Sequence, residues 1–201
     1  MAVLLLGNGE SRAGVDLNKI KMHKIGCNAI YRDYDVDELV CVDRRMVIEA
    51  CESNYKGTIY TRSNWQHYFV NKYSNVQSVP DLPYKGTTRQ DEPIHWGSGN
   101  FAQIIAAQSR HKVIYVLGFD LYGSGEKQVL HNNIYKGTKN YNKVEHKAVD
   151  PRYWITHFAK ICEIYKYKKF IIIAPNDWKR PKEWRTHNIE QISIDNVYNI
   201  C

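Results

Sequence analysis

Short apolar runs alternate along the chain with longer amphipathic stretches. Consecutive apolar side chains predict buried strands, because a strand covered on both faces shows no polar alternation. The predicted strands are Ala2–Leu6, Asn28–Tyr31, Leu39–Val42, Thr58–Tyr60, Val113–Leu117 and Phe170–Ala174. Helical spacing of apolar residues predicts helices over Arg44–Ser53, Gly99–Ser109 and Pro151–Tyr165.

This alternation of strands and helices favours a mostly parallel sheet flanked by helices. A chain of 201 residues suits one such domain, so we predict a single Rossmann-like α/β domain over residues 1–201. Residues 123–147 are expected to form a lid or a flexible loop. The proline-rich segment 78–95 is expected to be a substrate-facing flap or a surface connection.

Composition narrows the class of protein. Hydrophobic residues make up 43% of the chain and charged residues 24%, which excludes a disordered or low-complexity chain. The net charge of +7 favours polyanionic partners such as phosphates or nucleic acid, although dispersed basic residues are also typical of a solvated surface. A homo-oligomer is compatible with this composition.

Cysteine usage and hydropathy bear on location. The five cysteines contain no CxxC pair, which predicts reduced thiols and a cytoplasmic protein. The apolar opening Met1–Leu6 is too short for a signal-peptide core, and no stretch approaches the ~20 apolar residues that cross a bilayer. We therefore expect no membrane span.

The residues that follow the predicted strands carry the candidate chemistry, because ligands of open α/β sheets bind at the carboxyl ends of the strands. After the first strand, Gly7-Asn8-Gly9 allows a tight turn that brings backbone N–H groups and one amide against a phosphate or ribose. The turn is also compatible with a purely structural role. It matches neither GxxxxGK[ST] nor GxGxxG, since Arg12 occupies the place of the third glycine, which disfavours ATP or NAD chemistry.

A second candidate anion site lies at Ser98-Gly99-Asn100, ahead of an apolar helix, where an ordinary N-cap is the alternative. The acidic run Asp33–Asp37 has alternating carboxylates but lacks the glycine and distant glutamate of a calcium loop, so solvated side chains explain it better than a metal site. His146 precedes a predicted helix in a polar stretch and is either a general base or a surface histidine.

Four segments, in order and approximate spacing, resemble the bacterial sialyltransferases of glycosyltransferase family 42. They are Leu4–Ser11 with its GNG turn, Gly26–Tyr31 as a CN-containing strand, Ser98–Ala102 at a helix start, and Ile114–Tyr122 with its GFDLY end. The similarity covers about two thirds of the chain at the level of motifs.

The resemblance implies a GT-A-like fold, a CMP-sugar donor, and inverting, metal-independent transfer to a hydroxyl acceptor. It implies that Asn8 and Asn28 contact the nucleotide and its phosphate, that Tyr122 bonds the departing phosphate, and that His146 is the base. The other donor-binding candidates are Gly7, Gly9, Ser11, Asp43, Ser98, Gly99 and Asp120. No cofactor and no metal are expected.

Two departures from the family change the prediction. Gln128 stands about where a second tyrosine is expected, with His131, Tyr135 or Lys136 as substitutes. Asp43 replaces an asparagine near the donor sugar, and its carboxylate would repel the carboxylate of sialic acid while accepting hydroxyls of a neutral sugar. Nucleotide-sugar transfer is therefore a firmer prediction than transfer of sialic acid.

Other functions stay open on the sequence. Trp65, Trp96, Trp178 and Trp184, if exposed beside the basic segment 180–185, would favour a nucleic-acid acceptor with a modified base. A non-catalytic nucleotide or nucleic-acid binding module is another reading. A pyrophosphokinase or nucleotide hydrolase would need a divalent metal on Asp33, Asp35 or Asp43.

Overall fold

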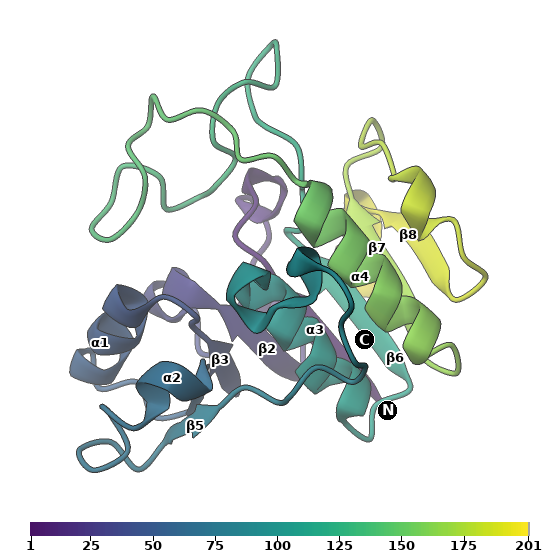
Figure 1. Ribbon diagram of the computed structural model, residues 1–201. Coiled ribbons are helices and arrows are strands. Elements are labelled where there is room, and N and C mark those ends of the chain that lie inside the picture. The colour runs from purple at the N-terminus through teal and green to yellow at the C-terminus, as the bar shows by residue number, and fades with distance from the viewer. Residues whose placement is uncertain (201) are drawn as a thin grey trace.

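The computed structural model describes residues 1–200, which form an α/β fold: one β-sheet flanked by helices (Figure 1). Every strand pairing in this part of the chain is parallel, in the order β5-β4-β3-β2-β1-β6-β7-β8. The strands are β1 Ala2–Leu6, β2 His23–Cys27, β3 Glu38–Val40, β4 Thr58–Thr61, β5 Val76–Ser78, β6 Val113–Leu117, β7 Lys169–Ala174 and β8 Ile189–Ser193. The predicted mostly parallel α/β fold is confirmed.

Within residues 1–200, four α-helices connect these strands. They are α1 Arg44–Glu52, α2 Ser63–Gln66, α3 Ser98–Gln108 and α4 Arg152–Ile164. The three longer ones match the predicted helices within one residue at each end, because their apolar spacing is strong. Short 3-10 helices lie at Glu10–Arg12, Leu17–Lys19, Asn28–Arg32, Arg89–Asp91, Pro93–His95, Lys182–Trp184 and Ile194–Ile200.

Each face of the sheet has its own core, because successive strand side chains point to opposite faces. Val3 and Leu5 pack with α3 and α4 on the face that Figure 1 shows in front, whereas Leu4 and Leu6 pack with α1 on the other. All four side chains are fully buried. The central strand is thus apolar throughout because both of its faces are covered, and the GNG turn follows at its carboxyl end.

The predicted strand Asn28–Tyr31 is wrong. The strand is His23–Cys27, and Asn28 begins a 3-10 helix with a φ of 51°. Asparagine tolerates this left-handed region better than most side chains, so it ends the strand and turns the chain. Strands β5 and β8 were also not predicted; both lie at sheet edges and carry exposed polar residues, which removes the apolar signal.

The segment 78–95 packs on α4. The buried carboxylate of Asp91 accepts hydrogen bonds from the Tyr84 hydroxyl, at 2.8 Å, and from the Thr88 hydroxyl, and it pairs with Lys160 of α4. This segment is therefore a surface connection and contributes no wall to the cavities described below.

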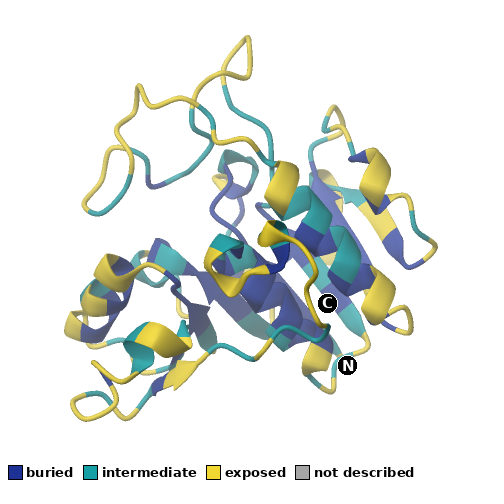
Figure 2. Cartoon of the chain, in the orientation of Figure 1, coloured by how far each residue is buried: buried dark blue, intermediate teal, exposed yellow. Residues whose placement is uncertain are grey.

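The chain between β6 and α4 forms a long excursion that stands away from the sheet in Figure 1. Within it, two isolated antiparallel bridges join Leu130 to Ser124 and to Lys147. Figure 2 shows that much of it is exposed. We keep the name predicted lid for residues 123–147, which lie in this excursion. Among residues 1–200, none of the helices combines the length and apolar character needed to cross a bilayer.

Candidate active site

A cavity of about 270 Å³ opens at the carboxyl edge of the sheet. Its walls come from the loops after β1, β2, β3 and β6, the start of α3, and side chains of α4 and the predicted lid. Nine of the predicted site residues line it: Gly7, Asn8, Gly9, Asn28, Asp43, Ser98, Gly99, Asp120 and Tyr122. Ser11 lies in the wall of an adjacent cavity, and His146 lines neither.

The GNG turn packs directly against the loop after β6. A Cβ atom at Gly7 would overlap the carbonyl oxygen of Gly118, and one at Gly9 would overlap the carboxyl group of Asp120. The backbones are joined by hydrogen bonds from Gly7 N–H to Leu117 O, at 2.8 Å, and from Gly9 N–H to Gly118 O, at 2.9 Å. These glycines therefore allow two loops to meet at the floor of the cavity.

Asn8 is held by its own protein neighbours. Its amide nitrogen donates to Cys27 O at 2.9 Å and to the Tyr141 hydroxyl at 3.1 Å, and its amide oxygen accepts from Arg12 at 3.1 Å. The Arg12 guanidinium is buried, and it also donates to Gly7 O and to the Tyr135 hydroxyl. The side chain of Asn8 therefore fixes the loop, and its backbone N–H makes no hydrogen bond within residues 1–200.

Ser98 lines the cavity and joins three elements. Its hydroxyl donates to Asn28 Oδ1 at 2.9 Å and accepts from Val42 N–H at 3.1 Å. The start of α3 is thus fastened to the ends of β2 and β3. The same contact orients the Asn28 side chain, whose amide nitrogen makes no hydrogen bond within the described chain.

Asp120 and Ser11 bind each other. The carboxylate accepts from Ser11 N–H at 2.8 Å and from the Ser11 hydroxyl. Burial raises the pKa of Asp120, and the hydrogen bonds from Ser11 oppose that shift. These hydrogen bonds join the turn after Gly9 to the loop after β6, so in this structure the pair stabilises the loop conformation.

Tyr122 presents a hydroxyl group that has no hydrogen-bond partner in the described residues. Burial, reinforced by the charge of Glu183, raises the pKa of this phenol. It therefore remains protonated near neutral pH and can donate a hydrogen bond to a developing negative charge.

Asp43 is exposed at the rim and begins α1 without capping it through its side chain. Its carboxylate makes no hydrogen bond or ion pair among residues 1–200. The prediction that Asp43 repels the carboxylate of a sialic acid donor requires such an unpaired carboxylate at the cavity.

Three of the eight histidines lie in different environments that bear on the site. His146 is exposed, and its backbone O accepts from His131 N–H at 2.8 Å. His131 lines the cavity, and burial together with the nearby His146 and Lys136 lowers its pKa. His157 is buried, stacks on Trp96 with ring centroids 4.1 Å apart, and bonds Gln90 O at 2.8 Å, so it is a core residue.

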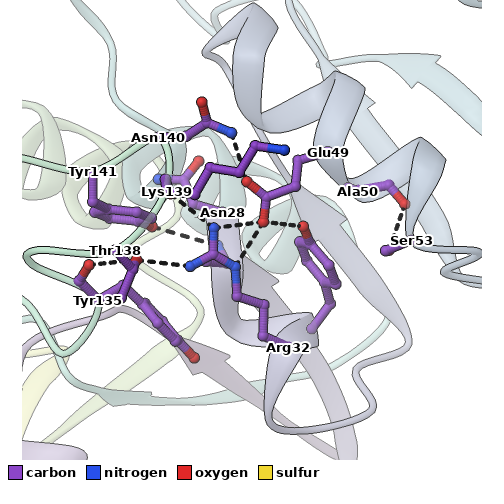
Figure 3. Close-up of polar contacts among 12 residues, drawn as sticks. Asn28, Arg32, Glu49, Ala50, Ser53, Tyr135, Thr138, Lys139, Asn140 and Tyr141 are labelled. Carbon is purple, nitrogen blue, oxygen red and sulfur yellow. Dashed lines mark hydrogen bonds and ion pairs between the residues drawn. The ribbon is translucent and has the colours of Figure 1, made fainter.

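The predicted lid is fastened to the body by a charged cluster (Figure 3). Arg32 donates to Glu49 Oε1 at 2.7 Å, to Thr138 Oγ1 at 2.8 Å and to Lys139 O at 2.9 Å. Glu49, on α1, also accepts from the Asn140 amide at 2.6 Å. The ion pair thus joins α1 to the 3-10 helix after β2, and hydrogen bonds from the same two side chains connect both elements to the predicted lid.

Two of the sequence alternatives can be compared with the structure. Trp96 and Trp184 are fully buried, and Arg180 donates to the carbonyls of Trp184 and Ile189, so these three side chains do not form an exposed basic and aromatic surface. Among residues 1–200, no three His, Cys, Asp or Glu side chains gather as metal ligands. Asp33 instead accepts a hydrogen bond from the Tyr135 hydroxyl.

Several cavity residues were not predicted from the sequence. Asn132 and Asn133 come from the predicted lid, and Trp154 and Phe158 come from α4. Their sequence context gives only a polar loop and an apolar helix face, so no local signal marks them. Only the return of the chain across the sheet edge brings them to the cavity.

The fold is similar to that of solved sialyltransferases. A variant of CstII in complex with CMP is 16% identical, with a TM-score of 0.57 over 88% of this chain and 83% of that one. CstII from Campylobacter jejuni with the substrate analogue CMP-3FNeuAc is 17% identical, with a TM-score of 0.53 over 87% and 82% of the two chains. No protein-family model and no curated protein matches the sequence. The chain thus has the GT-A-like fold of these sialyltransferases.

Proposed function

We propose that the protein is a glycosyltransferase that moves a sugar from a CMP-linked donor to a hydroxyl group of an acceptor. The observation that carries this proposal is the convergence of Asn8, Asn28, Ser98 and Tyr122 on one cavity, from segments far apart in the sequence. Its place at the carboxyl ends of parallel strands is the expected place for a nucleotide. The CMP complexes of proteins with the same fold support CMP as the nucleotide.

The charge of the site suits a phosphate group. Asn8 and Asn28 both line the cavity, and the backbone N–H of Asn8 and the side-chain amide nitrogen of Asn28 have no hydrogen-bond partner within the described residues. The buried guanidinium of Arg12, which has no ion pair within the described residues, lies directly behind the turn. A fixed cation and N–H donors stabilise an anion without reorganising when the charge grows.

In the proposed reaction the acceptor oxygen attacks the anomeric carbon of the donor sugar, with inversion. The bond from that carbon to the phosphate oxygen breaks, and CMP leaves with the bonding electrons. The acceptor proton passes to a histidine, for which we propose His146, and Tyr122 donates a hydrogen bond to the departing phosphate. Cytidine monophosphate is a good leaving group, so we propose that no metal ion is needed.

Nucleotide selectivity tests the first half of the proposal. CMP should raise the melting temperature more than UMP or GMP at equal concentration, because a ligand that binds only the folded state stabilises it. Asn28→Ala should weaken CMP binding, whereas Glu163→Ala, at an exposed position on α4, should leave it unchanged. Equal shifts with all three nucleotides would contradict a dedicated CMP site.

Two variants are needed to identify the base, because His131 and His146 lie side by side on the predicted lid, where the backbone N–H of His131 donates to the backbone O of His146. His146→Ala should abolish turnover of CMP-N-acetylneuraminic acid or a neutral CMP-sugar while preserving CMP binding. His131→Ala is the comparison, since His131 lines the cavity. If His146→Ala retains turnover and His131→Ala loses it, the base is His131. Full activity in EDTA is expected, and a strict Mg²⁺ requirement would contradict the metal-independent mechanism.

A further inference from the structure

A second cavity, of about 480 Å³, adjoins the first at the carboxyl ends of β1, β6 and β7. The two cavities share Asp120, Tyr122, Gly123 and Asn132. The loop after β6 therefore forms a common wall, with the unpartnered hydroxyl of Tyr122 bordering both spaces. Nothing in the proposed binding of the donor uses this second space.

The second cavity is lined by one tryptophan, Trp178. Trp178, in the loop after β7, is half-buried and donates its indole N–H to Asp120 O at 2.9 Å. That bond fixes the ring relative to the shared wall. An indole held in this way offers an apolar face of defined orientation, on which the C–H face of a sugar ring can pack.

The remaining polar groups are balanced in charge. Asp177 and Lys179 are exposed at the cavity, and neither forms an ion pair among residues 1–200. Glu10 pairs with Lys136, and Asp120 is bonded by Ser11. The free groups are thus one acid and one base, which do not attract a polyanionic strand, whereas a carboxylate and an amide such as Gln128 suit sugar hydroxyls.

We propose that the second cavity is the acceptor site and that it takes a neutral, hydroxyl-rich sugar ring. This inference rests on the proposed function of the first cavity. The ring packs against Trp178 and bonds Asp177, and its reacting hydroxyl lies at the shared wall beside Tyr122. From there its oxygen forms the new bond to the anomeric carbon as CMP departs, and its proton passes to the histidine of the predicted lid.

Ligand-observed saturation-transfer NMR tests the site without turnover. The probes are methyl glycosides of galactose, glucose and N-acetylglucosamine, each added to the 201-residue protein saturated with CMP. At least one neutral glycoside should bind, and Asp177→Ala should weaken it by about tenfold through loss of a charged hydrogen bond. Asp177→Asn should retain most of the binding, and Glu163→Ala should match the wild type.

The outcomes separate the two proposals. CMP binding should be the same in Asp177→Ala and in the wild type, because Asp177 does not line the first cavity. Failure of CMP to bind the wild type would remove the proposed function. Normal CMP binding with no glycoside binding, or with binding insensitive to Asp177→Ala, would overturn the acceptor site alone. Binding of single-stranded oligo-dT in place of glycosides would also overturn it, in favour of a nucleic-acid acceptor.

Discussion

Gly9 has no room for a side chain, whereas Gly14, five residues later, faces open space. Gly9→Ala should therefore lower the free energy of unfolding by about 1–3 kcal/mol, because the new methyl group displaces the Asp120 carboxyl from Ser11. Gly14→Ala is the matched control and should be neutral or slightly stabilising. Urea titration of both variants measures the difference, and equal stabilities would show that the two loops do not need this close approach.

Asp43 governs the charge at the rim where the donor sugar is expected. Asp43→Asn should tighten binding of CMP-N-acetylneuraminic acid by about fivefold, because one repulsion between partly solvated carboxylates is worth about 1 kcal/mol. Binding of CMP alone should not change, which makes CMP the internal control. Isothermal titration in low salt gives both affinities. Tighter binding of CMP itself would place the effect on the nucleotide and not on the sugar.

Among the elements, the ion pair between Arg32 and Glu49 adjoins the predicted lid, with which both side chains form hydrogen bonds. Their side chains are 22% and 15% exposed, so the pair is shielded from solvent far more than the surface pair of Arg152 and Asp150. A double-mutant cycle with Arg32→Gln and Glu49→Gln should give a coupling energy of about 1–2 kcal/mol. The pair of Arg152 and Asp150 should give no measurable coupling.

Loss of that anchor should also affect turnover more than nucleotide binding. The lid residues Thr138 and Lys139 would lose their charged hydrogen bonds, and residues 123–147 should exchange backbone amides faster in Arg32→Gln. We expect lower kcat with little change in CMP affinity. Unchanged exchange in this segment would show that the other contacts, such as that of Tyr141 with Asn8, hold the lid without Arg32.

At the scale of the whole molecule, three histidines set the dependence of stability on pH. Burial is the main cause that lowers the pKa of His111, His131 and His157. The unfolded chain therefore binds more protons than the native state once the pH falls below about 6.5, the ordinary value for histidine, so stability falls in that direction. Urea unfolding at pH 7.5, 6.5 and 5.5 measures it, with His157→Gln as the variant that should flatten the profile.

A second loss of stability is expected at lower pH, from protonation of Asp91. The hydrogen bond from Lys160, with others from Tyr84 and Thr88, holds the pKa of Asp91 well below its ordinary value. Its contribution is present above that ordinary value, near 4, and disappears as the carboxylate is protonated at more acidic pH. A stability profile that is flat from pH 7.5 to 5.5 would contradict the prediction for the three histidines but not the prediction for Asp91.

The long apolar and amphipathic segments predicted most of this fold. Strand Ala2–Leu6 is a short continuous apolar run, and helices α3 and α4 have apolar residues at helical spacing. The alternation of such segments favours a parallel sheet. Strand β2 was displaced in the prediction because His23 and Lys24 interrupt its apolar run, and Asn28 was included although it turns the chain. Edge strands β5 and β8 have too little buried surface to leave a pattern.

For the candidate site, the sequence by itself determined the chemistry available at the strand ends: a glycine-flanked amide, a serine before a helix, and a tyrosine after the GFD turn. Only the tertiary structure decided which of these atoms remain free. The amide of Asn8 and the hydroxyl of Ser98 are used by Arg12, Asn28 and neighbouring backbone groups, whereas the hydroxyl of Tyr122 is not. Local patterns show which side chains follow a strand. Several of the hydrogen-bond partners come from distant segments, such as Tyr141 for Asn8 and Asp120 for Ser11, and their approach depends on how the whole sheet packs.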